Sequence, residues 1–155
     1  MAKTIEDIIN TKLNGDPQKN ALSLIAHIRA TAPPERFPII IHDEKDESGW
    51  NISNLGFMII TGYDDFLGPW TMWLGTDNLG EHFETTIDEQ VKEFAWKHVS
   101  PCGNCGGKCS PGETTKVFGK IFENTCQANL VLVNPNADEI GYIKQLVDYI
   151  VAFKP

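Results

Sequence analysis

Apolar residues recur at helical spacing in two stretches near the N-terminus, over residues 4–13 and 17–31. Thr4 and Asp7 have the spacing of a capping box, in which each side chain accepts a hydrogen bond from the backbone of the other residue. Asp16, followed directly by proline, is expected to cap the second stretch. Two helices, the second of them amphipathic, are therefore predicted at the start of the chain.

Short runs of β-branched and aromatic residues follow, and glycine, aspartate and proline separate them. Runs of this kind predict the strands of an antiparallel sheet. Because successive side chains of a strand point to opposite faces, Trp70 and Trp73 are expected on opposite faces of the sheet. The four predicted strands are 37–41, 49–53, 57–61 and 70–74.

The C-terminal part returns to helical spacing twice. A third helix is predicted over residues 87–99, where Thr86 and Glu89 have the spacing of a capping box. Asn136 and Glu139 have the same spacing before the last helix. The core face of this last helix is expected to consist of Ile140, Ile143, Val147 and Ile150.

Between these two helices, residues 115–122 predict a hairpin that turns near Gly119, and residues 130–133 predict another short strand. The order of elements indicates an α+β fold, in which a small antiparallel sheet packs with helices and a cysteine-rich, zinc-knuckle-like insert precedes the last helix. With 155 residues, of which 41% are hydrophobic, the chain is expected to form a single domain over 1–155. Its predicted parts are a helix–sheet–helix body over 1–99, a metal-binding insert over 100–128, and a strand with the terminal helix over 129–155.

The net charge of −8 limits the possible partners. A chain this acidic lacks the basic surface that neutralises phosphates, so nucleic acid is not an expected partner. Acidic residues interrupt the apolar stretch that a signal peptide would need at the N-terminus. No later apolar segment has the length of a membrane span. We therefore expect a cytoplasmic protein without a membrane partner.

The four cysteines are the most informative residues of the chain. Cys102 and Cys105 are three positions apart and a glycine follows each, which permits the tight backbone turn of a zinc knuckle. Cys109 comes four positions later, and Cys126 completes the set seventeen positions beyond it, after the predicted hairpin. A reducing compartment disfavours disulfides, so we expect the four thiolates to bind one structural Zn²⁺ in a closed tetrahedral site.

Three other uses of the cysteines stay open. Four thiolates also suit an iron–sulfur cluster, although the spacing lacks the third closely spaced pair of bacterial ferredoxins. Cys102 and Cys105 alone could form a redox dithiol, and the last alternative is a set of metal-free thiols. His98, one helical turn before Cys102, is expected to pack beneath the site; its alternative role is to replace Cys109 as a ligand.

Three segments follow one another in the C-terminal part of the chain: the cysteine segment, the Phe118-Gly-Lys hairpin and the Asn134-Pro-Asn segment before the last helix. This order resembles the C-terminal third of a family of small, uncharacterised bacterial proteins. The resemblance covers about residues 94–150, and its most specific features are the cysteines and the hairpin. Because that family has no assigned activity, the resemblance implies a single zinc-ribbon-like group of cysteines and implies nothing about a substrate.

Aromatic residues gather around the predicted sheet. Such residues usually fill a core, yet a sheet face covered by helices and lined with tryptophan is also a common place for a planar or apolar ligand. The residues expected to line such a pocket are Trp50, Tyr63, Trp70 and Trp73.

The chain contains no motif for phosphate binding, for a nucleophilic serine or for a zinc protease. We therefore expect a non-enzymatic domain, with a structural zinc site, that binds a small molecule or a protein partner. The sequence leaves the ligand and the oligomeric state open. The alternative function is a small thiol- or metal-dependent redox enzyme that uses the cysteine cluster.

Overall fold

The computed structural model describes residues 2–44, 48–62, 68–76, 79, 87–103 and 112–153. The helices in these ranges are α1 (Ile5–Lys12), α2 (Gly15–Thr31), α3 (Glu89–Lys97) and α4 (Ala137–Phe153). The strands are β1 (Ile39–Asp43), β2 (Ser48–Ile52), β3 (Gly56–Ile60), β4 (Trp70–Gly75), β5 (Val99–Pro101), β6 (Glu113–Val117) and β7 (Lys120–Val133).

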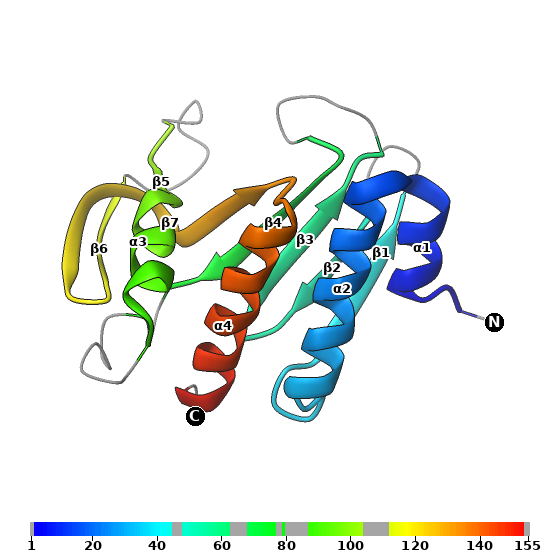
Figure 1. Cartoon of the computed structure of the whole chain (residues 1–155), viewed down its shortest axis with the longest axis horizontal. Helices are drawn as coiled ribbons and strands as arrows, with labels where there is room; N and C mark the ends of the chain where they lie inside the picture. The colour runs from blue at the N-terminus through cyan, green and yellow to red at the C-terminus, as the bar shows by residue number, and fades with distance from the viewer. Residues whose placement is uncertain are drawn as a thin grey trace.

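All seven strands form one antiparallel sheet in the order β1-β2-β3-β4-β7-β5, and β6 also pairs with β7. The helices lie in a layer over one face, with α2 and α4 in the middle of that layer (Figure 1). The protein is therefore an α+β fold, as predicted. None of the four helices in the described ranges is long and apolar enough to span a bilayer.

The two faces of the sheet differ in their side chains. Neighbouring strands align four buried residues in a row that faces the helices: Trp50, Met58, Met72 and Leu132. The adjacent row points to the opposite face because strand side chains alternate, and its members are only partly buried or are exposed: Asn51, Phe57, Trp73 and Val131. Trp70 is buried on the helix side, so the prediction that it and Trp73 lie on opposite faces is confirmed.

Two of the predicted helix caps are confirmed. The Thr4 hydroxyl accepts from the Asp7 N–H, and the Asp7 carboxylate accepts from the Thr4 N–H. Asn136 and Glu139 exchange the same pair of hydrogen bonds before α4. Both boxes depend only on residues three positions apart, so local spacing was sufficient to find them.

The caps predicted for α2 and α3 are wrong. Helix α2 begins at Gly15 with Asn14 as its N-cap, so Asp16 already belongs to the first turn. The link from α1 is only two residues long, and Gly15 closes the turn with a φ of +60°, which glycine adopts without strain. Helix α3 is capped by Asp88, whose carboxylate accepts from the Gln90 N–H at 2.7 Å; Thr86 lies outside the described residues.

The predicted hairpin is confirmed, and its turn consists of Phe118 and Gly119 between the paired Val117 and Lys120. Both turn residues have a positive φ, of 46° and 82°, as a type I′ turn requires. A phenylalanine seldom adopts this conformation. Its ring is buried edge-on against Tyr149 of α4, with 5.2 Å between centroids, and this packing offsets the backbone strain.

The sheet is larger than predicted, and most of the described part of residues 100–128 belongs to it. Residues 120–133 form one continuous strand, β7, where the sequence predicted a hairpin arm and a separate short strand. The end of the predicted third helix, at Val99, instead starts β5. The predicted knuckle around Cys105 and Cys109 lies outside the described residues.

A forked ion pair holds α1 against α2. The Arg29 Nε and Nη2 atoms both donate to the Glu6 carboxylate, with 3.0 Å for the second contact. The hydrogen bond from Arg29 lowers the pKa of Glu6 below its ordinary value of 4.5. A carboxyl group whose pKa is lowered by folding stabilises the protein above its unfolded pKa, and this contribution disappears as the pH falls through the folded pKa.

Replacing Glu6 by glutamine is therefore expected to remove a small, pH-dependent part of the stability. Both side chains are partly exposed, so solvent screens the pair and the loss at pH 7 should be only about 0.5 kcal/mol. Urea unfolding of the wild type and of Glu6→Gln at several pH values measures this difference. It should shrink toward zero as the pH falls below 4.5 and through the lowered pKa of folded Glu6; a difference that stays constant with pH would mean that the charge of Glu6 is irrelevant.

Candidate functional site

Two cysteines fall in the described ranges: Cys102 directly follows β5, and Cys126 lies in β7. Pro101 pairs with Thr125, and the Cys102 N–H donates to the Asn124 carbonyl oxygen at 2.7 Å. Cys102 and Cys126 are both half-buried free thiols. They lie on opposite sides of the Pro101–Thr125 pair along the ladder, so they are not direct cross-strand neighbours.

The pairing of β5 with β7 is irregular at this position. Val99 pairs with Leu130 and Pro101 pairs with Thr125, so residues 126–129 of β7 face Ser100 alone. The bulge begins at Cys126 itself. Bulges bend a strand and change the direction of its side chains, and they are frequent beside functional sites. Cys126 is therefore at a point where β7 departs from regular pairing.

The described residues do not contain a complete metal site. Within these ranges, no three His, Cys, Asp or Glu side chains come together in a way that could hold an ion. Cys105 and Cys109 lie outside the ranges, so the proposed set of four thiolates is untested. Four thiolates are a donor set that suits Zn²⁺; of the two described thiols, Cys102 follows β5 and Cys126 lies in β7, on opposite sides of the Pro101–Thr125 pair.

His98 is held by the helices. Its Nδ1 lies 2.7 Å from the Phe94 carbonyl oxygen, which can only accept, so Nδ1 carries the proton. The ring packs on Phe94 with 4.3 Å between centroids, and Nε2 is 3.7 Å from a carboxylate oxygen of Glu139. These contacts connect the C-terminal end of α3 to α4.

The tryptophans predicted to line one pocket do not share a surface. Trp50 and Trp70 are completely buried beneath the helices, and neither indole N–H has a hydrogen-bond partner in the described part of the chain. Trp73 lies on the other face of the sheet and stacks on Phe57, with 4.7 Å between ring centroids and 9° between planes. Tyr63 is outside the described residues.

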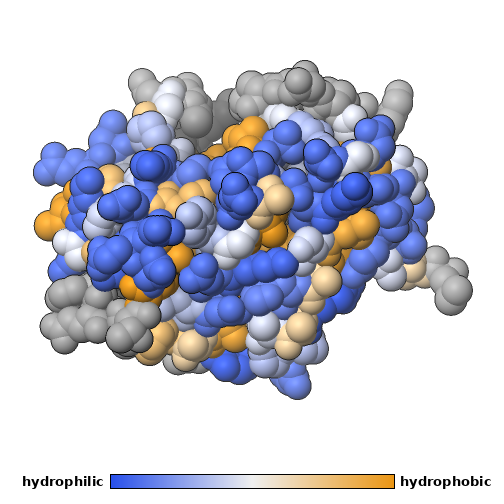
Figure 2. Space-filling model, in the orientation of Figure 1, coloured by the Kyte–Doolittle hydropathy of each residue, from blue (hydrophilic) through white to orange (hydrophobic). Residues whose placement is uncertain are grey.

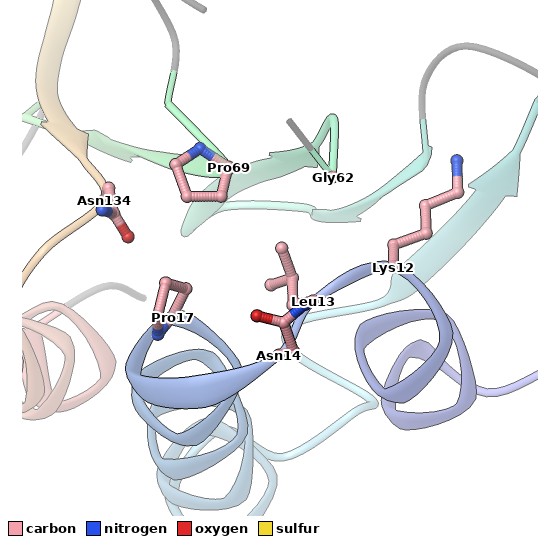
Figure 3. Close-up of a pocket in the computed structure, with 7 residues that line it drawn as sticks. All are labelled: Lys12, Leu13, Asn14, Pro17, Gly62, Pro69 and Asn134. Atoms are coloured by element: carbon pink, nitrogen blue, oxygen red, sulfur yellow. The ribbon is translucent and has the colours of Figure 1, made fainter. Parts of the chain in front are cut away.

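A pocket of about 320 Å³ lies where the α1–α2 turn meets the ends of three strands (Figure 3). Pro17 and Pro69 lie on two sides of it, and the side-chain amides of Asn14 and Asn134 point toward the space between them. The Lys12 side chain extends away from this space, and its amine is 3.5 Å from the Glu44 carbonyl oxygen. The complete lining is Lys12, Leu13, Asn14, Pro17, Gly62, Pro69 and Asn134.

Paired strand ends make the walls of this pocket. The Gly62 N–H donates to the Pro69 carbonyl oxygen at 3.2 Å, and the Asn134 N–H donates to the Trp70 carbonyl oxygen at 2.9 Å. Gly62 and Asn134 have positive φ values of 77° and 42°. These bonds fix the ends of β3, β4 and β7 relative to each other, so the pocket is part of the folded framework.

Sequence reasoning missed the pocket because its residues come from three turns that are far apart in the chain. A second hollow, of about 540 Å³, is close by between the starts of α2 and α4; its lining is mainly exposed and includes Asp16 and Asp138. The rest of the helix-covered side is largely hydrophilic, with scattered apolar residues (Figure 2). The first pocket is the one that combines a buried apolar residue, Leu13, with directed amides.

No protein-family model matches the chain, and neither a curated protein nor a solved structure matches it. The resemblance to small bacterial proteins therefore stays a prediction, and the candidate sites are judged on their geometry alone.

Proposed function

We propose that this protein is a non-enzymatic binding domain that takes a small neutral or anionic molecule in the pocket between Pro17 and Pro69, while its four cysteines hold a structural Zn²⁺. The observation that carries the binding function is the pocket itself, in which two asparagine amides face a space bordered by proline and leucine side chains. Pockets that combine apolar walls with a few directed polar groups are typical of small-molecule sites.

The chemistry of the lining supports this class of ligand. An amide side chain can both donate and accept, so Asn14 and Asn134 suit a molecule with hydroxyl, amide or carboxylate groups. The lining contains no acidic side chain and one lysine, although the whole chain has a net charge of −8. The lining therefore offers a cation no anionic partner. The volume is at the low end of the range of ligand pockets, about 300–1,000 Å³.

The zinc proposal rests on the spacing of the four cysteines along the chain. Zinc held by four thiolates has no open position for water, so its role would be structural. In this proposal His98 supports the site by fixing α3 to α4, because Nδ1 donates to the Phe94 carbonyl oxygen and Nε2 lies 3.7 Å from the Glu139 carboxylate.

Asn134→Gly is expected to abolish ligand binding without unfolding the protein. Glycine accepts the positive φ at this position, so the substitution removes the amide and leaves the backbone turn in place. The measurement is a screen of small polar metabolites by two-dimensional amide NMR. Compounds that bind should shift the amide signals of Leu13, Gly62 and Asn134 in the wild type and should not shift them in the variant.

Asn124→Gly is the matched control, because Asn124 is likewise an asparagine with a positive φ, of 55°, but lies within β7 and outside the pocket lining. This variant should bind like the wild type. Compounds that bind equally well to Asn134→Gly, or that shift signals only elsewhere, would contradict the pocket assignment.

Elemental analysis and a visible absorption spectrum of the untagged protein test the cysteine assignment. One zinc per chain without colour supports the structural role. Iron with a brown chromophore would indicate a cluster. A metal-free protein in which one cysteine is alkylated rapidly would favour the alternative function, a thiol-dependent redox enzyme.

A further inference from the structure

Strand β1 forms one edge of the sheet and is strongly apolar there. It begins with three consecutive isoleucines, Ile39, Ile40 and Ile41, of which Ile40 is 61% exposed and Ile41 is 37% exposed. Four large hydrophobic side chains are exposed in the described residues, and two of them, Ile40 and Ile41, are neighbours in the sequence. Soluble proteins usually protect such an edge with lysine, proline or a bulge.

None of these protections occurs in the isoleucine segment. Its residues pair with β2 in unbroken register, from Ile39 with Ile52 to Ile41 with Trp50. The N-terminal segment reaches the strand at its other end, where Lys3, just before α1, binds Asp43 at 2.9 Å and Lys12 of α1 contacts the Glu44 carbonyl oxygen. The isoleucine end of β1 is therefore the uncharged part of this edge.

One hydrogen bond determines which backbone groups of the isoleucine segment point toward β2 and which point away from the sheet. The Ser53 N–H donates to the Pro38 carbonyl oxygen, which makes this couple a hydrogen-bonded pair. Hydrogen-bonded and non-hydrogen-bonded pairs alternate along an antiparallel ladder, so Ile40 bonds to β2 while Ile39 and Ile41 point their N–H and C=O groups away from it. No backbone hydrogen bond from these outward groups to another element occurs within the described residues.

We propose that two copies of this chain pair through β1, in antiparallel orientation about a twofold axis at Ile40, to form one continuous sheet. In this register Ile39 of one copy lies opposite Ile41 of the other, and both have outward backbone groups that can exchange hydrogen bonds. The two Ile40 side chains face each other in a non-hydrogen-bonded pair, where side chains come closest. Each of the three isoleucines of one copy then lies opposite an isoleucine of the other copy.

The sequence of β1 favours this occupant and this register. A twofold axis at Ile41 would instead place Asp43 of each copy opposite Ile39 of the other, which sets a carboxylate against an apolar side chain. The axis at Ile40 instead places each Asp43, with its Lys3 partner, opposite position 37 of the other copy, which precedes β1 and whose phenylalanine is buried in its own core. A twofold interface between identical chains requires a surface that is complementary to itself, and β1 meets this requirement in the register about Ile40.

Sedimentation of the full chain over a range of concentrations tests the proposal, with Ile40→Lys as the disrupting variant. The wild type is expected to show a monomer–dimer equilibrium. Ile40→Lys should weaken the dimer about a hundredfold, because it removes two exposed isoleucines and places two like charges opposite each other. Ile121→Lys is the matched control, since Ile121 is 65% exposed on another part of the sheet, and it should dimerise like the wild type.

Cross-linking tests the register independently of affinity. Ile40→Cys should form a disulfide between copies on mild oxidation, because residues in a non-hydrogen-bonded pair have Cα atoms about 4.5 Å apart, within disulfide range. Peptide mass spectrometry would find position 40 joined to position 40. Ile41→Cys should not give this product.

A wild type that is monomeric up to its solubility limit would overturn the proposal, as would a dimer that Ile40→Lys leaves intact. A dimer cross-linked through position 41 would overturn the register. Pairing of β1 with a strand of another protein, in a chain that stays monomeric alone, would likewise exclude a second copy as the occupant. A folded Ile40→Lys variant, checked by its circular dichroism spectrum, excludes unfolding as the cause of dissociation.

Discussion

Trp70→Ala is expected to lower the free energy of unfolding by about 3–5 kcal/mol. The indole ring is completely buried between the helices and the sheet, and alanine would leave a large cavity at the start of β4. Chemical denaturation of the purified variant measures the loss. The binding pocket lies beside this residue, so the same variant should also lose pocket binding because its framework loosens.

Two substitutions separate the causes of this effect. Trp70→Phe keeps most of the volume and should cost much less, because the indole N–H has no hydrogen-bond partner in the described residues and none is lost. Trp73→Ala tests the other face, where the ring is only partly buried, and should cost about 1–2 kcal/mol. Equal losses for Trp70→Ala and Trp73→Ala would show that the helix-covered face is not the main core.

Cys126→Ser is expected to release the zinc and to lower the free energy of unfolding by at least about 3 kcal/mol, because formation of a structural zinc site is coupled to folding. Elemental analysis measures the metal and thermal unfolding measures the stability. Digestion with a protease should become faster in the cysteine segment, which depends on the bound ion in this proposal.

The wild type treated with a strong chelator is the matched control for Cys126→Ser. Both samples should unfold at the same temperature, and added zinc should restore the wild type alone. Ser100→Ala, a substitution opposite the bulge of β7 that keeps every thiol, should retain its metal. Full metal content and unchanged melting in Cys126→Ser would contradict the proposed set of four ligands.

Local patterns were sufficient for much of this fold. The capping boxes at Thr4 and Asn136 and the turn at Gly119 each depend on residues within four positions of each other, and all three are present. The strands of the first part were also found because β-branched and aromatic residues mark each of them. Errors at their ends are one or two residues.

The elements that were missed depend on distant partners. Strand β5 has three residues, one of them proline, and carries no periodic signal; its pairing with β7 alone makes it a strand. Strand β7 was predicted in pieces because the polar residues around Asn124 interrupt its apolar pattern. The pocket unites turns from three parts of the chain, and no spacing within one segment could reveal it.

The long strand β7 connects the region of the cysteines to the pocket. Cys126 lies in its first half, and Asn134 of the pocket directly follows its last residue. The second half of β7 is held by β4 and by the Asn134–Trp70 hydrogen bond, and the covalent strand connects this half to the one that carries Cys126. By thermodynamic linkage, a metal that stabilised this strand would strengthen binding in the pocket, and a bound molecule would in return tighten the hold of the cysteines on the metal.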